Sequence, residues 1–293
     1  MNKNAITGKT NGEGGEAVRH EKEEASVSEA TRLSARLIYE VIRRDGEEEL
    51  ERPIFSLICS GVAAGILISL SVLTEAILRT YLDPDRPSTF LIENMGYTLG
   101  FIVVIFGRMQ LFTENTITTV LPVIARPDRQ CVTAMVRLWS IVLAANMVGA
   151  FIAASFLGLT DVMSADLRTA IMELSRHATG FGAYEGFIKA VPAGVLIAAV
   201  VWMMPSARGN AFFLIFAFTW LIAAGDFAHV VAGSVEMAYL MVLDELGFVP
   251  AVFGFFLPVL AGNVVGGTAI FALLAWGQVR NEVAHGTGGD ESR

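Results

Sequence analysis

Charged residues are scarce in this chain of 293 residues and account for 17% of it, against roughly 25% in soluble domains. The deficit is uneven, because residues 1–52 hold 12 acidic and 9 basic side chains whereas residues 249–277 hold none. Hydrophobic residues make up 54% of the chain. This distribution excludes an ordinary soluble enzyme and indicates an integral membrane protein built from helices.

Cysteine and basic residues are also few. Two cysteines, Cys59 and Cys131, exclude a disulfide scaffold and a cysteine-rich metal site. A net charge of −8 without a basic stripe excludes a nucleic-acid binder. The sequence has no nucleophile–base set and no phosphate-cradling glycine loop, so we expect neither an enzyme nor a metal or cofactor. The first 30 residues lack an apolar core, and we expect no cleavable signal peptide.

Six apolar stretches are long enough to cross a bilayer, which takes roughly 20 residues for a helix. They occupy residues 54–78, 90–111, 132–158, 187–204, 211–225 with a continuation from Val235, and 249–277. An even number places both termini on one side, and ten arginines inside against five basic residues outside favour the cytoplasm. We therefore expect a multi-pass protein of the cell inner (plasma) membrane, in contact with membrane lipid.

Three regions follow from this count. Residues 1–50 are predicted to form a polar cytoplasmic tail, and 27–50 can form an amphipathic helix because Leu33, Leu37 and Val41 share a face. A solvated charged helix is the open alternative there. Residues 51–280 are the six-helix transmembrane domain, and residues 281–293 are a second cytoplasmic tail.

The second and fifth stretches are interrupted at matching places. Polar residues interrupt them at Phe112-Thr113-Glu114 and at Asp226-Phe227-Ala228-His229, and each break is followed by an Asn-x-x-Gly, at Asn146 and at Asn263. Matched breaks in two sets of three spans indicate an internal duplication with inverted halves, and interrupted spans point to a transport site. The predicted fold is all-α, with six transmembrane helices in two inverted three-helix repeats whose second and fifth helices are broken. We expect Asn146 and Asn263 to bond the freed loop groups.

A few ionisable side chains lie within the apolar stretches, where each costs roughly 2.5–3.5 kcal/mol on insertion scales. They are Arg108, Glu114, Asp226 and His229. We expect Arg108 to pair with Asp226 or Glu114. An imidazole titrates near about pH 6.5, so His229 is a candidate to hold or lend a proton; the alternative is a hydrogen-bonded core histidine.

In this order and spacing, four motifs resemble those of the formate/nitrite transporter family. They are Leu111-Phe112-Thr113, Ala145-Asn146-Met147-Val148-Gly149, Phe227-Ala228-His229-Val230-Val231-Ala232-Gly233 and Gly262-Asn263-Val264-Val265-Gly266-Gly267. The resemblance covers about residues 50–280. It implies an aquaporin-like fold, a homopentamer with one pore in each protomer, and small monovalent anions such as formate, nitrite or hydrosulfide as substrates.

The resemblance also implies roles for individual residues. His229 and Thr113 meet at the pore centre, and apolar side chains around them form constrictions. The implied pore residues are His229, Thr113, Phe112, Leu111, Phe101, Ile197, Ile222 and Phe227, with Asn115, Asn146 and Asn263 supporting the loops. The sequence departs from the family pattern at Arg108, Gln110, Gly194, Ala228 and Gly233, which marks a divergent branch.

Two functions of different kinds are compatible with these features. The first is a channel or transporter for small monovalent anions of weak acids, passive or proton-coupled through the central histidine. The second is an aquaporin-like channel for small neutral solutes. A sensor or scaffold without transport is a third reading, supported only by the acidic tail. Ion flux measured in liposomes separates the first two.

Overall fold

The computed structural model describes residues 33–286, and the parts of the predicted tails before and after this range lie outside it. The described chain is helical throughout. Its α-helices are α2 (Ala35–Glu51), α3 (Ile54–Leu67), α4 (Ser69–Tyr81), α5 (Thr89–Gly96), α6 (Thr98–Phe106), α7 (Phe112–Thr118), α8 (Val120–Ala125), α9 (Arg129–Leu159), α10 (Ala165–Thr179), α11 (Ala183–Ala207), α12 (Ala211–Ala224), α13 (Val230–Val242), α14 (Leu257–Val264) and α15 (Leu273–Gly286). A 3-10 turn (Arg208–Asn210) precedes α12, and Pro250–Phe256 and Val265–Ala272 are π-helical.

Five continuous helical stretches of the described chain are long and apolar enough to cross a membrane. They are Ile54–Tyr81, Thr89–Phe106, Arg129–Leu159, Ala183–Ala207 and Pro250–Asn281. The remaining span consists of α12 and α13, each too short to cross alone. The second span continues after its break as α7 and α8. The prediction of six spans, with the second and fifth broken, is confirmed.

Glycines allow the first and third helices of each half to pack closely. Helix α3 lies along α9, and α11 lies along α14. A Cβ atom added to Gly149 would lie 2.2 Å from the Val62 carbonyl oxygen, and one on Gly266 would lie 2.1 Å from that of Val191. Any side chain at these two positions would therefore force the helices apart. The glycine of each Asn-x-x-Gly motif is fixed by this contact.

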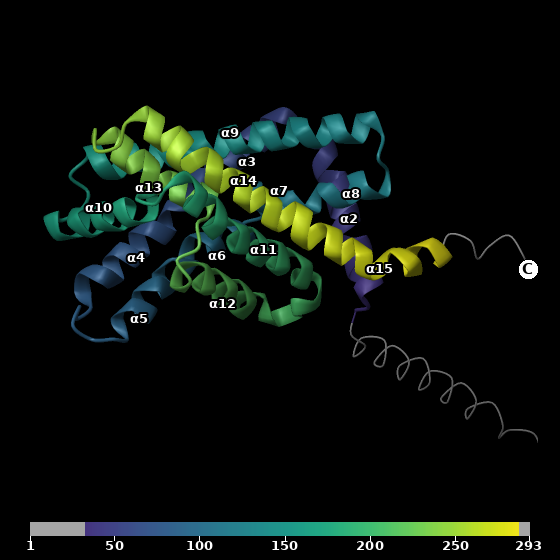
Figure 1. Cartoon of the computed structure of the whole chain (residues 1–293), viewed down its shortest axis with the longest axis horizontal. Helices are drawn as coiled ribbons and strands as arrows, with labels where there is room; N and C mark the ends of the chain where they lie inside the picture. The colour runs from purple at the N-terminus through teal and green to yellow at the C-terminus, as the bar shows by residue number, and fades with distance from the viewer. Residues whose placement is uncertain (1–32, 287–293) are drawn as a thin grey trace, which may run out of the picture. The chain divides into compact units, whose positions relative to one another are not determined.

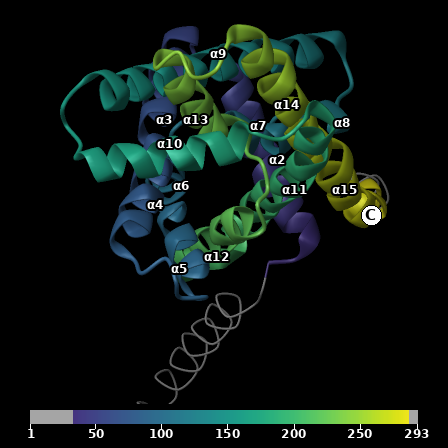
Figure 2. The same cartoon turned by 60° about the vertical axis from the view of Figure 1, so that its left-hand side comes forward.

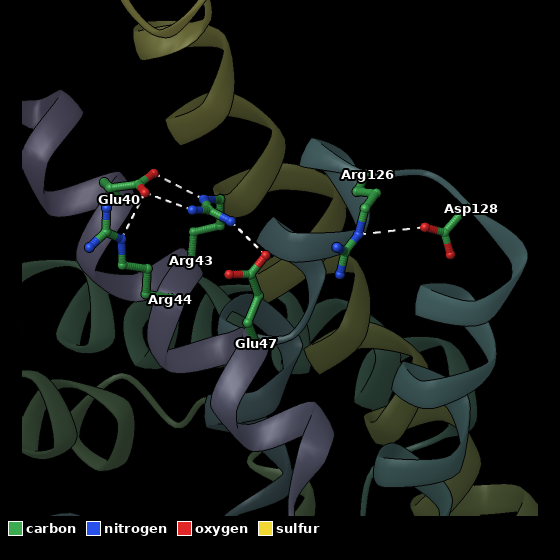
Figure 3. A network of polar contacts seen from close by, with 6 residues as sticks. All are labelled: Glu40, Arg43, Arg44, Glu47, Arg126 and Asp128. Atoms are coloured by element: carbon green, nitrogen blue, oxygen red, sulfur yellow. Dashed lines mark hydrogen bonds and ion pairs between the residues drawn. The ribbon is translucent and has the colours of Figure 1, made fainter. Parts of the chain in front are cut away.

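Helix α2 packs against one end of the bundle. Its buried side chains Tyr39, Ile42 and Leu50 face α7, α8, α9, α11 and α15. The flank of this buried face carries a row of ion pairs, in which Arg43 joins Glu40 and Glu47 at 2.6 Å (Figure 3). The hydrogen bonds from Arg43 hold the pKa of Glu40 at about 2, well below its usual range.

Helix α10 lies across α13 and α4 (Figure 2). The apolar spans do not predict this helix, because it is amphipathic rather than apolar. Its signals are nevertheless in the sequence. Ser164 caps the first turn by accepting the Leu167 N–H, and Ala170, Ile171 and Leu174 form the buried stripe. Figure 1 places α10, α4 and α5 at one end of the bundle and α2, α8 and α15 at the other.

Candidate functional site

Each break in a spanning helix is closed by the same backbone turn. After α6, the N–H of Met109 bonds the Val104 carbonyl, and Arg108 between them adopts a left-handed conformation with φ 50°. After α12, the N–H of Phe227 bonds the Ile222 carbonyl, and Asp226 has φ 54°. Both turns are Schellman caps in which a charged residue takes the place usually held by glycine. The first break thus covers residues 107–111, slightly earlier than the sequence indicates, and Thr113 lies in the first turn of α7.

Asn146 on α9 binds the backbone of the first break. Its Nδ2 donates to the carbonyl oxygens of Gly61 and Gln110 at 2.8 Å each. Its Oδ1 accepts the N–H of Phe112 at 2.9 Å. Asn115 assists by donating to the Gln110 side chain at 3.2 Å. Backbone groups freed by a break must be satisfied within a bilayer, and one buried asparagine satisfies two of them here.

Asn263 on α14 repeats this arrangement at the second break. Its Nδ2 donates to the carbonyl oxygens of Ala190 at 2.8 Å and Ala228 at 3.0 Å. Its Oδ1 accepts the N–H of Val230 at 2.8 Å. Each asparagine therefore joins the first helix of its own half to both sides of the break. The same three hydrogen bonds thus recur in both halves, as the internal duplication predicts.

His229 and Thr113 meet where the two breaks face each other. The Thr113 Oγ1 and His229 Nε2 atoms lie 2.8 Å apart, and both residues are buried. His229 Nδ1 accepts the N–H of Ala232 at 3.3 Å and so caps α13. Because Nδ1 accepts, the proton of the neutral ring lies on Nε2, which donates to Thr113. The Phe101 ring stands edge-on to the imidazole, with 4.9 Å between centroids.

Two cavities are lined in part by α2 and in part by α10, respectively, and these helices lie at opposite ends of the bundle (Figure 1). The first, here called the α2 cavity, has a volume of about 440 Å³ and is lined by residues that include Asp45, Glu49, Arg108, Glu114, Leu111 and Ile197. The second, here called the α10 cavity, has a volume of about 340 Å³ and is lined by residues that include Glu75, Glu93, Asp226, Phe227, His229 and Glu236. The two sets of lining residues do not overlap. Phe101 and Thr113 line neither cavity and lie beside His229.

The structure divides the predicted pore residues into groups. Leu111 and Ile197 border the α2 cavity, and Phe227 and His229 border the α10 cavity. Phe112 lines neither cavity and instead packs edge-on against Trp139 of α9, with 5.6 Å between ring centroids. Ile222 is fully buried and also lines neither cavity, while its carbonyl closes the second break.

Of the two partners predicted for Arg108, Asp226 is wrong, and Glu114 lies within electrostatic range of Arg108 but forms no ion pair with it. Asp226 lies on the α10 cavity, where its carboxylate binds Lys189 Nζ and, at 2.9 Å, His177 Nε2. Arg108 lies on the α2 cavity with Glu114, and within the described residues it has no ion pair. The reason is geometric: the two residues hold equivalent positions in inverted repeats, and inversion places such positions on opposite sides.

The structure brings three buried acids together on the wall of the α10 cavity, which the sequence does not indicate. Glu75, Glu93 and Glu236 are 9%, 8% and 7% exposed, and all three line the cavity. Glu236 is not evident as a site residue from the sequence, because an apolar run surrounds it. The signal that identifies it is helical spacing, since His229, Gly233 and Glu236 fall on one face of α13.

Comparison with known proteins identifies the family. A model of the family described as formate/nitrite transporter matches residues 36–277. The chain belongs to the formate/nitrite transporter family. Within it, the chain is 43% identical over 251 residues to the inner membrane protein YfdC of Escherichia coli K12, covering 86% of this chain and 81% of that protein.

A more distant relative and two solved structures are consistent with this family. The chain is 30% identical over 190 residues to the formate channel FocA of Haemophilus influenzae, covering 62% of this chain and 65% of that protein. Its fold matches a solved FNT family ion channel with a TM-score of 0.72 at 19% identity, covering 82% of this chain and 98% of that one. It also matches a pentameric formate channel with formate bound, with a TM-score of 0.67 at 21% identity, covering 78% and 98%. The chain is therefore a multi-pass channel or transporter of aquaporin-like fold, and not an enzyme.

Proposed function

We propose that the chain conducts small monovalent anions of weak acids, such as formate or nitrite, through a pathway centred on His229. The observation that carries this proposal is the 2.8 Å contact between the buried residues Thr113 and His229, the second of which lines the α10 cavity. The relative named as a formate channel and the fold match titled with formate bound support the choice of substrate class.

The physical demand on such a centre is strict. An anion that leaves water for an apolar passage loses its hydration, and the cost far exceeds what apolar walls return. The imidazole Nε2–H and the Thr113 hydroxyl are the two donors available beside Phe101 to replace lost water. A proton taken up by the anion removes the same cost altogether. Transport coupled to protons is therefore the form of the proposal that the buried, apolar surroundings favour.

A second candidate function is a channel for small neutral solutes. The observation in its favour is the charge of the two cavities. Asp45, Glu49 and Glu114 outnumber Arg108 on the α2 cavity. On the α10 cavity, Arg79 and His177 face four acids, which are Glu75, Glu93, Asp226 and Glu236. Ionised acids repel anions, so these walls suit neutral species or anions that travel with a proton.

Assembly and orientation belong to the same proposal. We expect five copies around an axis, as in the solved pentameric formate channel, each with its own pathway. Large apolar side chains exposed on one protomer, among them Phe55, Phe156, Phe213 and Leu274, would then face lipid or a neighbouring copy. We further expect an inner-membrane location with both termini, and hence the α2 cavity, on the cytoplasmic side.

The test uses purified full-length protein in liposomes. Uptake of formate, nitrite, hydrosulfide, acetate and glycerol is measured with and without a membrane potential or a pH gradient. We expect uptake of at least one weak-acid anion that responds to an imposed pH gradient. Glycerol uptake without anion uptake would favour the neutral-solute channel, and no uptake of any of the five would contradict both candidates.

A further inference from the structure

The hydrogen bonds of His229 leave open where a transported proton comes from. With Nδ1 accepting the Ala232 N–H, the imidazole carries a single ring proton on Nε2. That proton can make a hydrogen bond, but giving it up would leave an imidazolate anion in an apolar site. A second proton on Nδ1 would displace the Ala232 N–H and uncap α13. A proton donor other than His229 is therefore required on the pathway.

The α10 cavity contains side chains of the required kind. Glu236 follows His229 by seven residues on α13, which is roughly 10 Å along the helix, with Gly233 between them on the same face. Glu75 on α4 and Glu93 on α5 line the same cavity. Glu75 lies within electrostatic range of both other acids. The cavity thus leads from a group of three carboxyls to the imidazole.

Two of these carboxyls have no direct partner in the structure, and Arg79 acts on Glu75 only at longer electrostatic range. Within the described residues, neither Glu75 nor Glu236 makes an ion pair or a side-chain hydrogen bond, although each is more than nine-tenths buried. Glu93 has one cation, Arg79 at 3.6 Å, and Arg79 is shared with Glu173 at 3.4 Å. Tyr97 on α6 adds a hydroxyl to the same wall, and that hydroxyl also lacks a partner in the described chain although Tyr97 is only 8% exposed.

The other charged groups around the cavity do not compensate these acids. Helix α10 contributes His177 and Glu173, and the second break contributes Asp226. His177 and Lys189 of α11 are both bound to Asp226, and Lys189 also pairs with Glu185 at 3.2 Å. The other elements packed against α13, which are α3, α7, α9, Pro250–Phe256 and α14, add no ionisable side chain to the cavity lining.

A metal ion does not account for the cluster, because the described residues hold no group of His, Cys, Asp and Glu arranged to bind one. Neighbouring carboxyls in a buried site cannot all ionise when so little positive charge is available, and at least one of them holds a proton. The cavity has room for a small weak-acid molecule beside that proton, and the unpartnered Tyr97 hydroxyl is free to bind it.

We propose that Glu75, Glu93 and Glu236 form a proton-binding site that protonates a weak-acid anion in the α10 cavity before it reaches His229. The O–H bond of the Glu236 carboxyl breaks, and an O–H bond forms on the substrate. The neutral acid moves to Thr113 and His229. The Glu236 carboxylate regains a proton from Glu75, and Glu75 takes one from hydronium that enters the cavity from the aqueous side, which leaves water. This inference rests on the proposed function, and it places the protonation step at the three glutamates of the α10 cavity rather than at His229.

The first experiment measures the proton directly and does not depend on transport. Infrared difference spectroscopy on the full-length protein at neutral pH follows the carbonyl stretch of protonated carboxyl groups. We expect a band that is lost or shifted in Glu236→Gln or Glu75→Gln. The matched control is Asp161→Asn, because Asp161 is fully exposed in the described chain and its loss should leave the band unchanged. A band that neither glutamine variant affects would overturn the proposal.

The second experiment tests the role of the site in transport. Formate uptake into liposomes is measured between about pH 5 and pH 8. Wild-type uptake should fall by up to about tenfold per pH unit once the site begins to lose its proton, and Glu236→Gln should flatten this profile while Asp161→Asn keeps it. An unchanged profile in Glu236→Gln would overturn the proposal. If the infrared band behaves as expected but no weak acid is transported, the proton-binding site is supported and the proposed function fails.

Discussion

Two charged residues, Arg108 and Asp226, occupy the strained position of the helix breaks. Both have positive φ, at 50° and 54°, and a non-glycine residue pays roughly 1–2 kcal/mol for this conformation. Asp226 offsets the cost through its contacts with Lys189 and His177. Arg108 has no ion pair among the described residues and meets Asp45 and Glu114 only at longer electrostatic range, which offsets less of its strain. At equivalent positions of the two repeats, the strain is therefore offset by side-chain contacts at Asp226 and less so at Arg108.

This difference predicts opposite effects of one substitution. Arg108→Gly should raise the free energy of unfolding by about 1 kcal/mol, because glycine adopts positive φ without strain. Asp226→Gly should lower it, because two polar contacts are lost along with the strain. Thermal unfolding midpoints of both variants in one detergent provide the measurement. Shifts of the same sign would show that the strain is not the deciding factor.

The two asparagines that hold the breaks should be among the most sensitive residues. Asn146→Leu and Asn263→Leu each remove three buried hydrogen bonds. At roughly 1–3 kcal/mol for each group left unsatisfied, the loss should reach about 3 kcal/mol or more. The unfolding midpoint and the folded yield measure it. Asn210→Leu is the matched control, since Asn210 is exposed, and a similar loss there would contradict this account.

At the scale of helices, the close contact between α2 and α7 leads to a third prediction. A Cβ on Gly46 would lie 2.0 Å from the Thr118 carbonyl oxygen, whereas one on Gly277 of α15 would meet nothing within 4 Å. Both glycines lie inside helices, where alanine is otherwise favoured by about 1 kcal/mol. Gly46→Ala should therefore detach α2 and speed its amide hydrogen exchange, while Gly277→Ala should leave α2 unchanged. Equal exchange in the two variants would contradict the contact.

Apolar length and matched interruptions make the helices largely predictable from the sequence. The six spans, the two breaks and the duplication follow from where apolar runs start and stop. Helix α10 does not, because it is a surface helix whose stripe is short and whose remaining residues are polar. The cap at each break cannot be predicted from the sequence either, because Arg108 and Asp226 replace the glycine that normally marks a left-handed position.

The candidate site was predictable where it depends on local motifs and less so where it depends on topology. The contact between Thr113 and His229 joins residues 116 positions apart, and the family motifs pointed to it. The pairing expected for Arg108 failed because proximity to a break does not fix the side of the membrane. Glu236 was missed because its neighbours in α13 are apolar, so that only its helical phase relative to His229 identifies it.

At the scale of the whole molecule, the fourth prediction concerns assembly. The protein should be a homopentamer, because a protomer exposes large apolar side chains on several helices and the fold matches a pentameric channel. Native mass spectrometry from detergent measures the number of copies directly. A stable monomer or trimer as the main species would contradict this prediction.

The central claim is that His229 and Thr113 together form the narrow point of an anion pathway. Its most direct test is the pH profile of formate or nitrite flux into liposomes, from about pH 5 to about pH 8, for His229→Asn and Thr113→Val, with assembly checked by size-exclusion chromatography. We predict that His229→Asn lowers flux at every pH in this range while the oligomer stays intact, because the Nε2–H donor at the narrow point is lost, and that Thr113→Val slows flux to a smaller degree. Wild-type rates across this range in the His229 variant would contradict the account and make the histidine a structural residue.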